Sequence, residues 1–72
     1  MSDTIGKRLR AYRKLKNFTQ QELADKLHVS IAIVGAIERG TRLPSKDLLR
    51  SIHEVLGVTE QELKGEAVTF GG

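Results

Sequence analysis

The hydrophobic positions along this chain recur at the three- and four-residue spacing of amphipathic helices. In the first segment they form one stripe, made of Ile5, Leu9, Tyr12 and Leu15. Similar spacing continues through the following short segments, and no segment reads as a strand. The pattern predicts an all-α fold, a compact bundle of about five short helices.

Residues with special backbone roles set the expected helix boundaries. Ser, Thr and Asp accept hydrogen bonds at a helix start, whereas Asn and Gly adopt the left-handed conformation that ends a helix. Proline keeps the preceding residue out of the helical region, so Leu43-Pro44 predicts an extended link. The expected starts are Ser2 or Asp3, Thr19, Ser30, Ser45 and Thr59, and the expected stops are Asn17, Gly40, Gly57 and Gly65. Thr19 and Thr59 each precede a glutamate by three residues, which is the spacing of a capping box.

The length of 72 residues leaves room for one domain with a small core. We expect residues 1–65 to form it and residues 66–72, which lack periodicity, to be a short flexible tail. No apolar run approaches the roughly 18 residues that span a bilayer, so no membrane role is expected. The chain is expected to be soluble and cytoplasmic.

Catalytic chemistry has little support in the sequence. There is no cysteine, the carboxylates are scattered over helix faces, and no serine sits in a nucleophile motif. His28 and His53 are far apart and lack neighbouring ligands, which argues against a metal site. We therefore expect no enzyme activity, no metal, no cofactor and no small-molecule substrate.

The charge distribution is uneven, although the net charge is only +3. The first helix is strongly basic, and the chain becomes acidic from Glu54 onward. Such a basic region suits a polyanion or an acidic partner. A solvated helix face explains the same charges equally well. The basic residues are Lys7, Arg8, Arg10, Arg13, Lys14 and Lys16.

The second and third predicted helices are separated by a tight turn of about three residues. Such a turn makes the two helices cross steeply, as in a helix-turn-helix whose second helix enters the major groove of DNA. The run from Ile5 to Leu63 resembles the Cro/CI (XRE-type) helix-turn-helix family. The matching segments are IGKRLRAYRK, FTQQELADKL followed by VS, then IERG, LPSKDLL and LGVTEQEL. The resemblance implies a lambda-repressor-like DNA-binding domain in a bacterial or phage transcriptional regulator, acting at the nucleoid of the host cell.

The resemblance also implies roles for individual residues. Arg13 and Glu38 match a family pair that forms an internal ion pair, which would join the first helix to the third. His28 stands where the family usually has glycine, and we interpret it as a left-handed turn residue. The residues that match the family's phosphate-contacting positions are Gln20, Arg39, Thr41 and Arg42. For Gln20, the alternative is an ordinary helix-forming glutamine at the surface.

The third helix, which begins after Ser30, departs from the family pattern. Val34 and Ile37 are expected to face the core. The positions expected to face outward are Ile31, Ala32, Ile33, Gly35 and Ala36, none of which can donate a side-chain hydrogen bond to a base edge. Gly35 is costly in a helix interior, by about 1 kcal/mol relative to alanine, and so suggests close approach by another backbone.

Three interpretations of this apolar face remain open. The first is DNA binding of low base specificity, with Ile31 or Ala32 touching thymine methyl groups and Ser30 making a polar contact. The second is a protein interface. The third is a surface that has lost its role, or one covered by Val68 and Phe70 of the tail.

For the protein interface, we expect another helix-turn-helix repressor as the partner. The chain would then act as an antirepressor or co-repressor in a gene switch. We expect a protein partner to use the face at least as much as double-stranded DNA does. A homodimer formed through the fifth helix or the tail is a further alternative.

Overall fold

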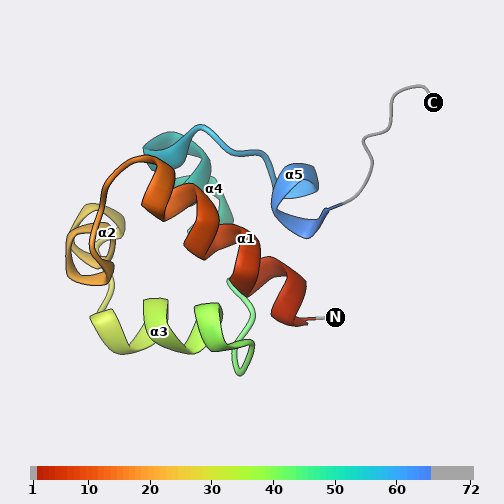
Figure 1. The fold of residues 1–72 in the computed structure, drawn as a ribbon, viewed down its shortest axis with the longest axis horizontal. Helices are drawn as coiled ribbons and strands as arrows, with labels where there is room; N and C mark the ends of the chain where they lie inside the picture. Colours follow the sequence, from red (N-terminus) through yellow and green to blue (C-terminus); the bar gives the residue numbers. More distant parts are fainter. Residues whose placement is uncertain (1, 66–72) are drawn as a thin grey trace.

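Five helices and no strand make up residues 2–65, the part of the chain that this computed structural model describes; its side chains are described from residue 4 (Figure 1). They are α1 (Ser2–Leu15), α2 (Gln20–Leu27), α3 (Ile31–Arg39), α4 (Lys46–Leu56) and α5 (Glu60–Lys64). The predicted all-α fold of about five short helices is confirmed. α1 already includes Ser2 and Asp3, so neither residue precedes the helix as the predicted cap would. The tail of residues 66–72, with Val68 and Phe70, lies outside the described residues.

The predicted caps position the other helix ends. Thr19 Oγ1 accepts from the Glu22 amide at 3.0 Å, and the Glu22 carboxylate accepts from the Thr19 amide at 2.8 Å, which completes a capping box. Thr59 and Glu62 form a second one. Ser30 and Ser45 cap α3 and α4, and the left-handed residues that follow α1 to α5 are Asn17, His28, Gly40, Gly57 and Gly65. These local predictions are confirmed, including the left-handed conformation of His28.

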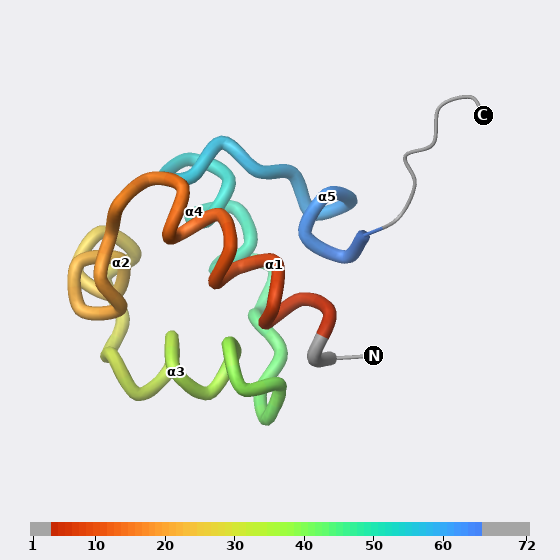
Figure 2. Tube along the Cα trace, viewed as in Figure 1, coloured from red at the N-terminus to blue at the C-terminus, as the bar shows by residue number. Residues whose placement is uncertain are grey.

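All five helices contribute side chains to the core. α1 runs through the middle of the molecule, with α3 along one edge and α2 and α5 on opposite sides (Figures 1 and 2). α1 packs against α3 and α5, α2 packs against α3 and α4, and α4 packs against α5. Burial of each large apolar side chain contributes roughly 1.5–3 kcal/mol. The fully buried large side chains are Leu9, Leu23, Val34, Ile37, Ile52, Val58 and Leu63.

Gly6 allows α1 to cross very close to the last turn of α3. A Cβ atom at this position would overlap the Ile37 carbonyl oxygen and would lie 2.6 Å from the Glu38 carbonyl oxygen. Both obstacles are backbone atoms, so they cannot rotate away as a flexible side chain would. The crossing of α1 and α3 therefore requires glycine at position 6.

Substitution of Gly6 by alanine is expected to destabilise the domain by about 2 kcal/mol or more, because overpacking against the fixed backbone outweighs the gain in helix propensity. Urea unfolding followed by circular dichroism measures the change. Gly35→Ala is the matched control, because the nearest atom to its new methyl group belongs to the flexible Arg39 side chain. A Gly6→Ala variant as stable as the Gly35→Ala variant would contradict the close crossing.

Candidate nucleic-acid interface

α3 is anchored by one side and presents the other to solvent. Val34 and Ile37 are fully buried, as predicted for the core-facing pair. On the outer side, Ile31 is 42% exposed, and Ser30 and Ala32 are also exposed. The presented apolar surface is therefore concentrated at the N-terminal half-turn of α3.

Three of the five predicted outward positions are not exposed. Ile33 is half-buried and packs against the hydrophobic core. Gly35 is buried, because the Arg39 guanidinium and the Gln20 amide lie over it. Ala36 is half-buried. The sequence prediction of a five-residue apolar face was wrong, since only Ile31 and Ala32 of these five residues are exposed.

The carboxylate of Glu38 joins α1, α2 and α3. Arg13 donates from Nε to Glu38 Oε2 at 2.7 Å and from Nη2 to Oε1 at 3.2 Å. Arg13 also donates from Nη1 to the Phe18 carbonyl oxygen at 2.8 Å. The two side chains of the ion pair are only 9% and 5% exposed. The predicted Arg13–Glu38 ion pair is present and nearly buried.

Gln20 is also tied to this carboxylate. Its Nε2 donates to Glu38 Oε1 at 3.0 Å, so the first residue of α2 is held against the C-terminal half of α3. The sequence prediction treated Gln20 only as a phosphate contact or a surface glutamine. This internal hydrogen bond leaves one hydrogen of the Gln20 amide for another acceptor.

The other three predicted phosphate contacts, Arg39 at the end of α3 and Thr41 and Arg42 in the loop after it, differ in their surroundings. Arg39 and Arg42 are exposed. Thr41 instead caps α3: both its amide, at 3.0 Å, and its hydroxyl, at 3.1 Å, donate to the Ala36 carbonyl oxygen. Both donors of Thr41 are thus used within the domain, and its contact with the DNA backbone stays a prediction.

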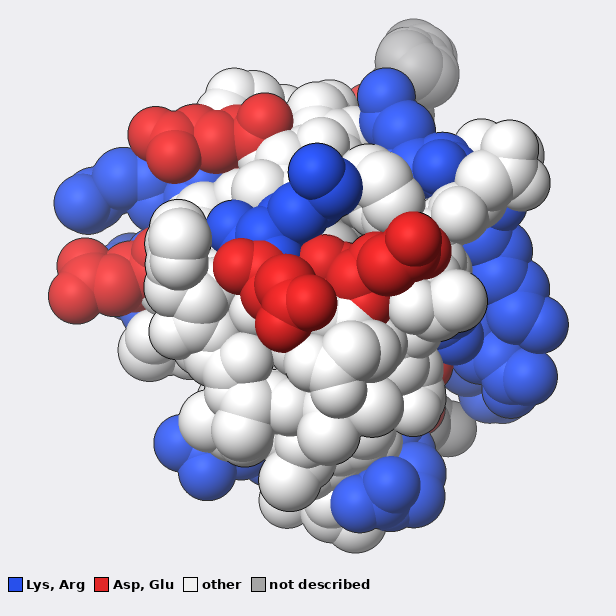
Figure 3. Space-filling model, turned by 90° about the vertical axis from the view of Figure 1, so that its left-hand side faces the viewer, with Lys and Arg blue, Asp and Glu red and all other residues white. Residues whose placement is uncertain are grey.

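Charge is distributed unevenly around α3. Viewed from the α2 side, acidic side chains gather across the middle of the molecule, and the surface below them, at the level of α3, is uncharged (Figure 3). Lys and Arg side chains border this uncharged area at both lower edges. An uncharged centre with basic edges is suited to a partner whose charge is negative on both sides.

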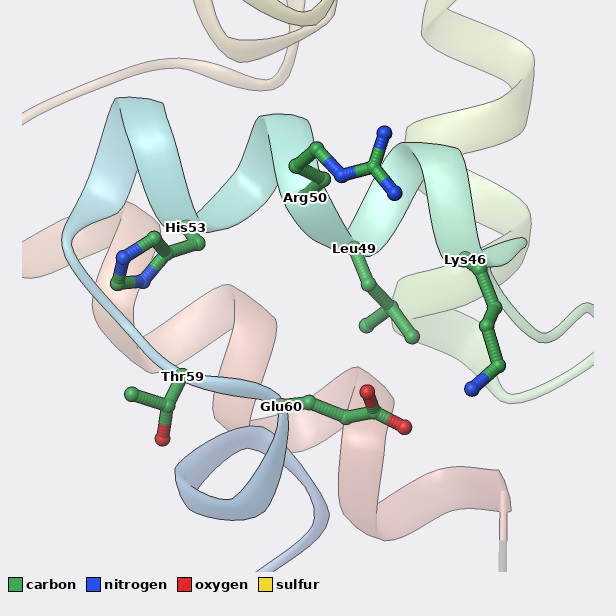
Figure 4. A pocket seen from close by; sticks show the side chains of 6 residues that line it. All are labelled: Lys46, Leu49, Arg50, His53, Thr59 and Glu60. Carbon is green, nitrogen blue, oxygen red and sulfur yellow. The ribbon is translucent and has the colours of Figure 1, made fainter.

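A separate pocket of about 360 Å³ lies between α4 and the start of α5 (Figure 4). Leu49 lies at its centre between Lys46 and His53, and His53 Nδ1 is 3.3 Å from the Val58 carbonyl oxygen. The hydrogen bond and charge of Lys64, whose Nζ lies 2.8 Å from Glu60 Oε2, lower the pKa of Glu60. The other lining residues are Arg50 and Thr59. None of these residues was singled out by the sequence as a functional residue.

Two features are absent among the described residues. Within residues 4–65, no three His, Asp or Glu side chains gather as a metal site would require. None of the described helices is long and apolar enough to cross a membrane.

The fold and the exposed third helix define a helix-turn-helix domain, and the chain belongs to the helix-turn-helix family, whose model matches residues 9–63. It is a small transcriptional regulator of the Cro/CI (XRE) type, as the sequence resemblance predicted.

The relatives are transcriptional regulators. The chain is 47% identical over 58 residues to the HTH-type transcriptional regulator YazB of Bacillus subtilis, covering 81% of this chain and 84% of YazB. It is 35% identical over 63 residues to the immunity repressor protein of Bacillus phage phi105, covering 88% of this chain but only 44% of the repressor. The crystal structure of the clp gene regulator ClgR from Corynebacterium glutamicum is similar at a TM-score of 0.78 and 32% identity, over 86% of this chain and 66% of ClgR.

Removing one partner of the Arg13–Glu38 pair is expected to cost about 3–5 kcal/mol of unfolding free energy, because an uncompensated buried charge is left behind. Arg13→Met and Glu38→Gln are the single variants, and urea unfolding measures each of them and the double variant. The double variant is expected to lose less than the sum of the two single losses, since neither charge is then orphaned. Strictly additive losses would show that the two side chains do not interact.

Proposed function

We propose that this regulator binds double-stranded DNA directly, with α3 in the major groove, and acts as a repressor of low base specificity. The observation that supports this proposal is the position of α3. Its inner side is fully buried at Val34 and Ile37, while its N-terminal half-turn is exposed. Recognition helices of this class contact base edges mainly through their N-terminal residues. The similarity to a phage immunity repressor supports repression as the outcome.

The exposed half-turn of α3 has few polar side chains that could contact a base. Ser30 Oγ accepts from the Ile33 amide at 3.3 Å, which leaves its hydroxyl hydrogen for a base or a phosphate. Ile31 and Ala32 offer apolar contact to thymine methyl groups. Each bidentate base contact is worth roughly 1–3 kcal/mol of discrimination, and this half-turn has no side chain that makes one. Specificity then depends strongly on DNA shape and backbone contacts.

In this proposal the DNA backbone is held by donors that lie near the C-terminal half of α3. Gln20 lies at the start of α2, where helix amides favour an anion, and its free amide hydrogen donates to a phosphate. Arg39, the last residue of α3, and Arg42, in the loop after it, supply positive charge at the same end of α3. The protein acts in the cytoplasm, at the nucleoid of its host.

Direct binding predicts affinity that falls steeply with salt, because each neutralised phosphate contributes about −0.9 to the slope of log K against log salt concentration. Fluorescence anisotropy with a duplex from the gene's own upstream region, and with a mixed-sequence duplex, measures this slope. Arg42→Gln is expected to reduce the slope by about 0.9.

The control for this experiment is Arg50→Gln, which removes the same charge from α4, where Arg50 lies 3.7 Å from Asp47. This variant is expected to bind like the unsubstituted protein. Absence of binding to either duplex at low salt would exclude direct DNA recognition.

A second candidate is docking of another repressor on the same half-turn, which would make the chain an antirepressor or co-repressor. The exposure of Ile31 favours it, because a large aliphatic side chain exposed to solvent suits a protein contact. The burial of Gly35 and the packing of Ile33 make this apolar surface small, and for that reason we rank docking second. A second copy of the chain is an alternative partner.

Docking predicts that Ile31→Asp abolishes capture of a helix-turn-helix partner while the fold is kept, because the charge would be buried without compensation. A photo-crosslinker at Ala32 identifies the partner, and calorimetry with the purified partner compares unsubstituted and Ile31→Asp proteins. Leu15→Asp, at a residue 75% exposed on α1, is the matched control. Equal partner affinity for Ile31→Asp and the unsubstituted protein would remove docking as a function of this surface.

A further inference from the structure

We infer that Gly35 is a positioning residue that seats the Arg39 guanidinium beside the Gln20 amide, so that these two side chains form one anion site. The inference rests on the proposed DNA binding and assigns the anion as a backbone phosphate of the duplex. It also gives a position to Arg39, which the family resemblance grouped with Thr41 and Arg42 among the phosphate-contacting residues.

The geometry around Gly35 supports this role. The position that a Cβ atom would occupy lies 3.0 Å from Arg39 Nη1 and 4.0 Å from Gln20 Nε2. Both donors therefore lie within 4.0 Å of the same point, although they belong to different helices. Arg39 is four residues after Gly35, one turn along α3, so its side chain folds back over the glycine.

The Gln20 donor is fixed by the ion-pair cluster beneath it. Its Nε2 is committed to Glu38 Oε1 at 3.0 Å, and this contact orients the amide and leaves one hydrogen. Arg13 already compensates the Glu38 charge through two hydrogen bonds. Among the described residues, no acidic side chain is paired with Arg39, so its charge remains available for an anion.

The two donors suit a phosphate group. A guanidinium binds one phosphate oxygen, or two in its bidentate geometry, and the neutral amide donates to another. A surface arginine without a fixed position would contribute less to the free energy of phosphate binding, because the rotamer freedom that it loses on binding offsets the attraction. Placement over Gly35 reduces this loss.

The position also explains why a costly residue occurs in a short helix. Glycine destabilises a helix interior by about 1 kcal/mol relative to alanine. A Cβ atom 3.0 Å from Nη1 would displace the guanidinium by a few tenths of an ångström, and a longer side chain would occupy its place. The close approach at Gly35 is therefore made by side chains of the same domain.

The test is a double-mutant cycle between position 35 and Arg39, read by anisotropy with the mixed-sequence duplex. Arg39→Gln and Gly35→Leu are each expected to weaken binding by about fivefold and to reduce the salt slope by about 0.9. The double variant is expected to bind no more weakly than Arg39→Gln alone. The control combines Gly35→Leu with Arg42→Gln. The two losses of DNA affinity should multiply in this combination, because the two positions act independently.

Stability is measured in parallel, since a purely structural role would lower the melting temperature without changing the salt slope. If Gly35→Leu does not fold, Gly35→Ala decides: we expect about a twofold loss of affinity with Arg39 present and none in the Arg39→Gln background. Losses that multiply between positions 35 and 39, or an unchanged salt slope in Gly35→Leu, would overturn the positioning role while direct DNA binding stands. Failure of the unsubstituted protein to bind any duplex would overturn both.

Discussion

The carboxylate of Glu38 holds together the three helices that make the helix-turn-helix, and the position of α3 depends on it. Arg13 reaches it from α1 and Gln20 reaches it from α2, in a region almost closed to water. A charge in such a place is tolerated only when it is paired and hydrogen-bonded. The backbone crossing at Gly6 lies at the same end of α3, so polar pairing and close packing fix the same turn.

This arrangement explains how a helix of nine residues keeps its position. An isolated helix of this length is marginal in water, because nucleation is costly and few hydrogen bonds follow. α3 has a serine cap at its start, a left-handed glycine and the Thr41 donors at its end, and two fully buried aliphatic residues between them. Its exposed half-turn therefore belongs to a rigid element rather than to a mobile loop.

Local rules predicted what depends on local structure. The boxes at Thr19 and Thr59 and the left-handed stop at Asn17 follow from a few residues of local sequence. The left-handed conformation of His28 was predicted from its match to the family's glycine position. The Arg13–Glu38 pair spans 25 positions, and a family motif was needed to predict it.

Other predictions were wrong because they depended on tertiary packing. Helical periodicity placed Gly35 and Ile33 on the outer side of α3. It cannot show that the Arg39 and Gln20 side chains cover Gly35, or that Ile33 packs against the core. Local sequence also does not show that α1 and α3 cross closely at Gly6. A Cβ atom there would collide with the α3 backbone, which is distant in sequence. A side chain's exposure and hydrogen-bond partners depend on its neighbours in space. Ile31 and Ala32 are separate from the buried residues that anchor α3, and this separation has an evolutionary consequence. If α3 binds DNA as proposed, substitutions at these two positions change the binding preference without loosening the scaffold, so the preference can diverge quickly while the fold stays constant.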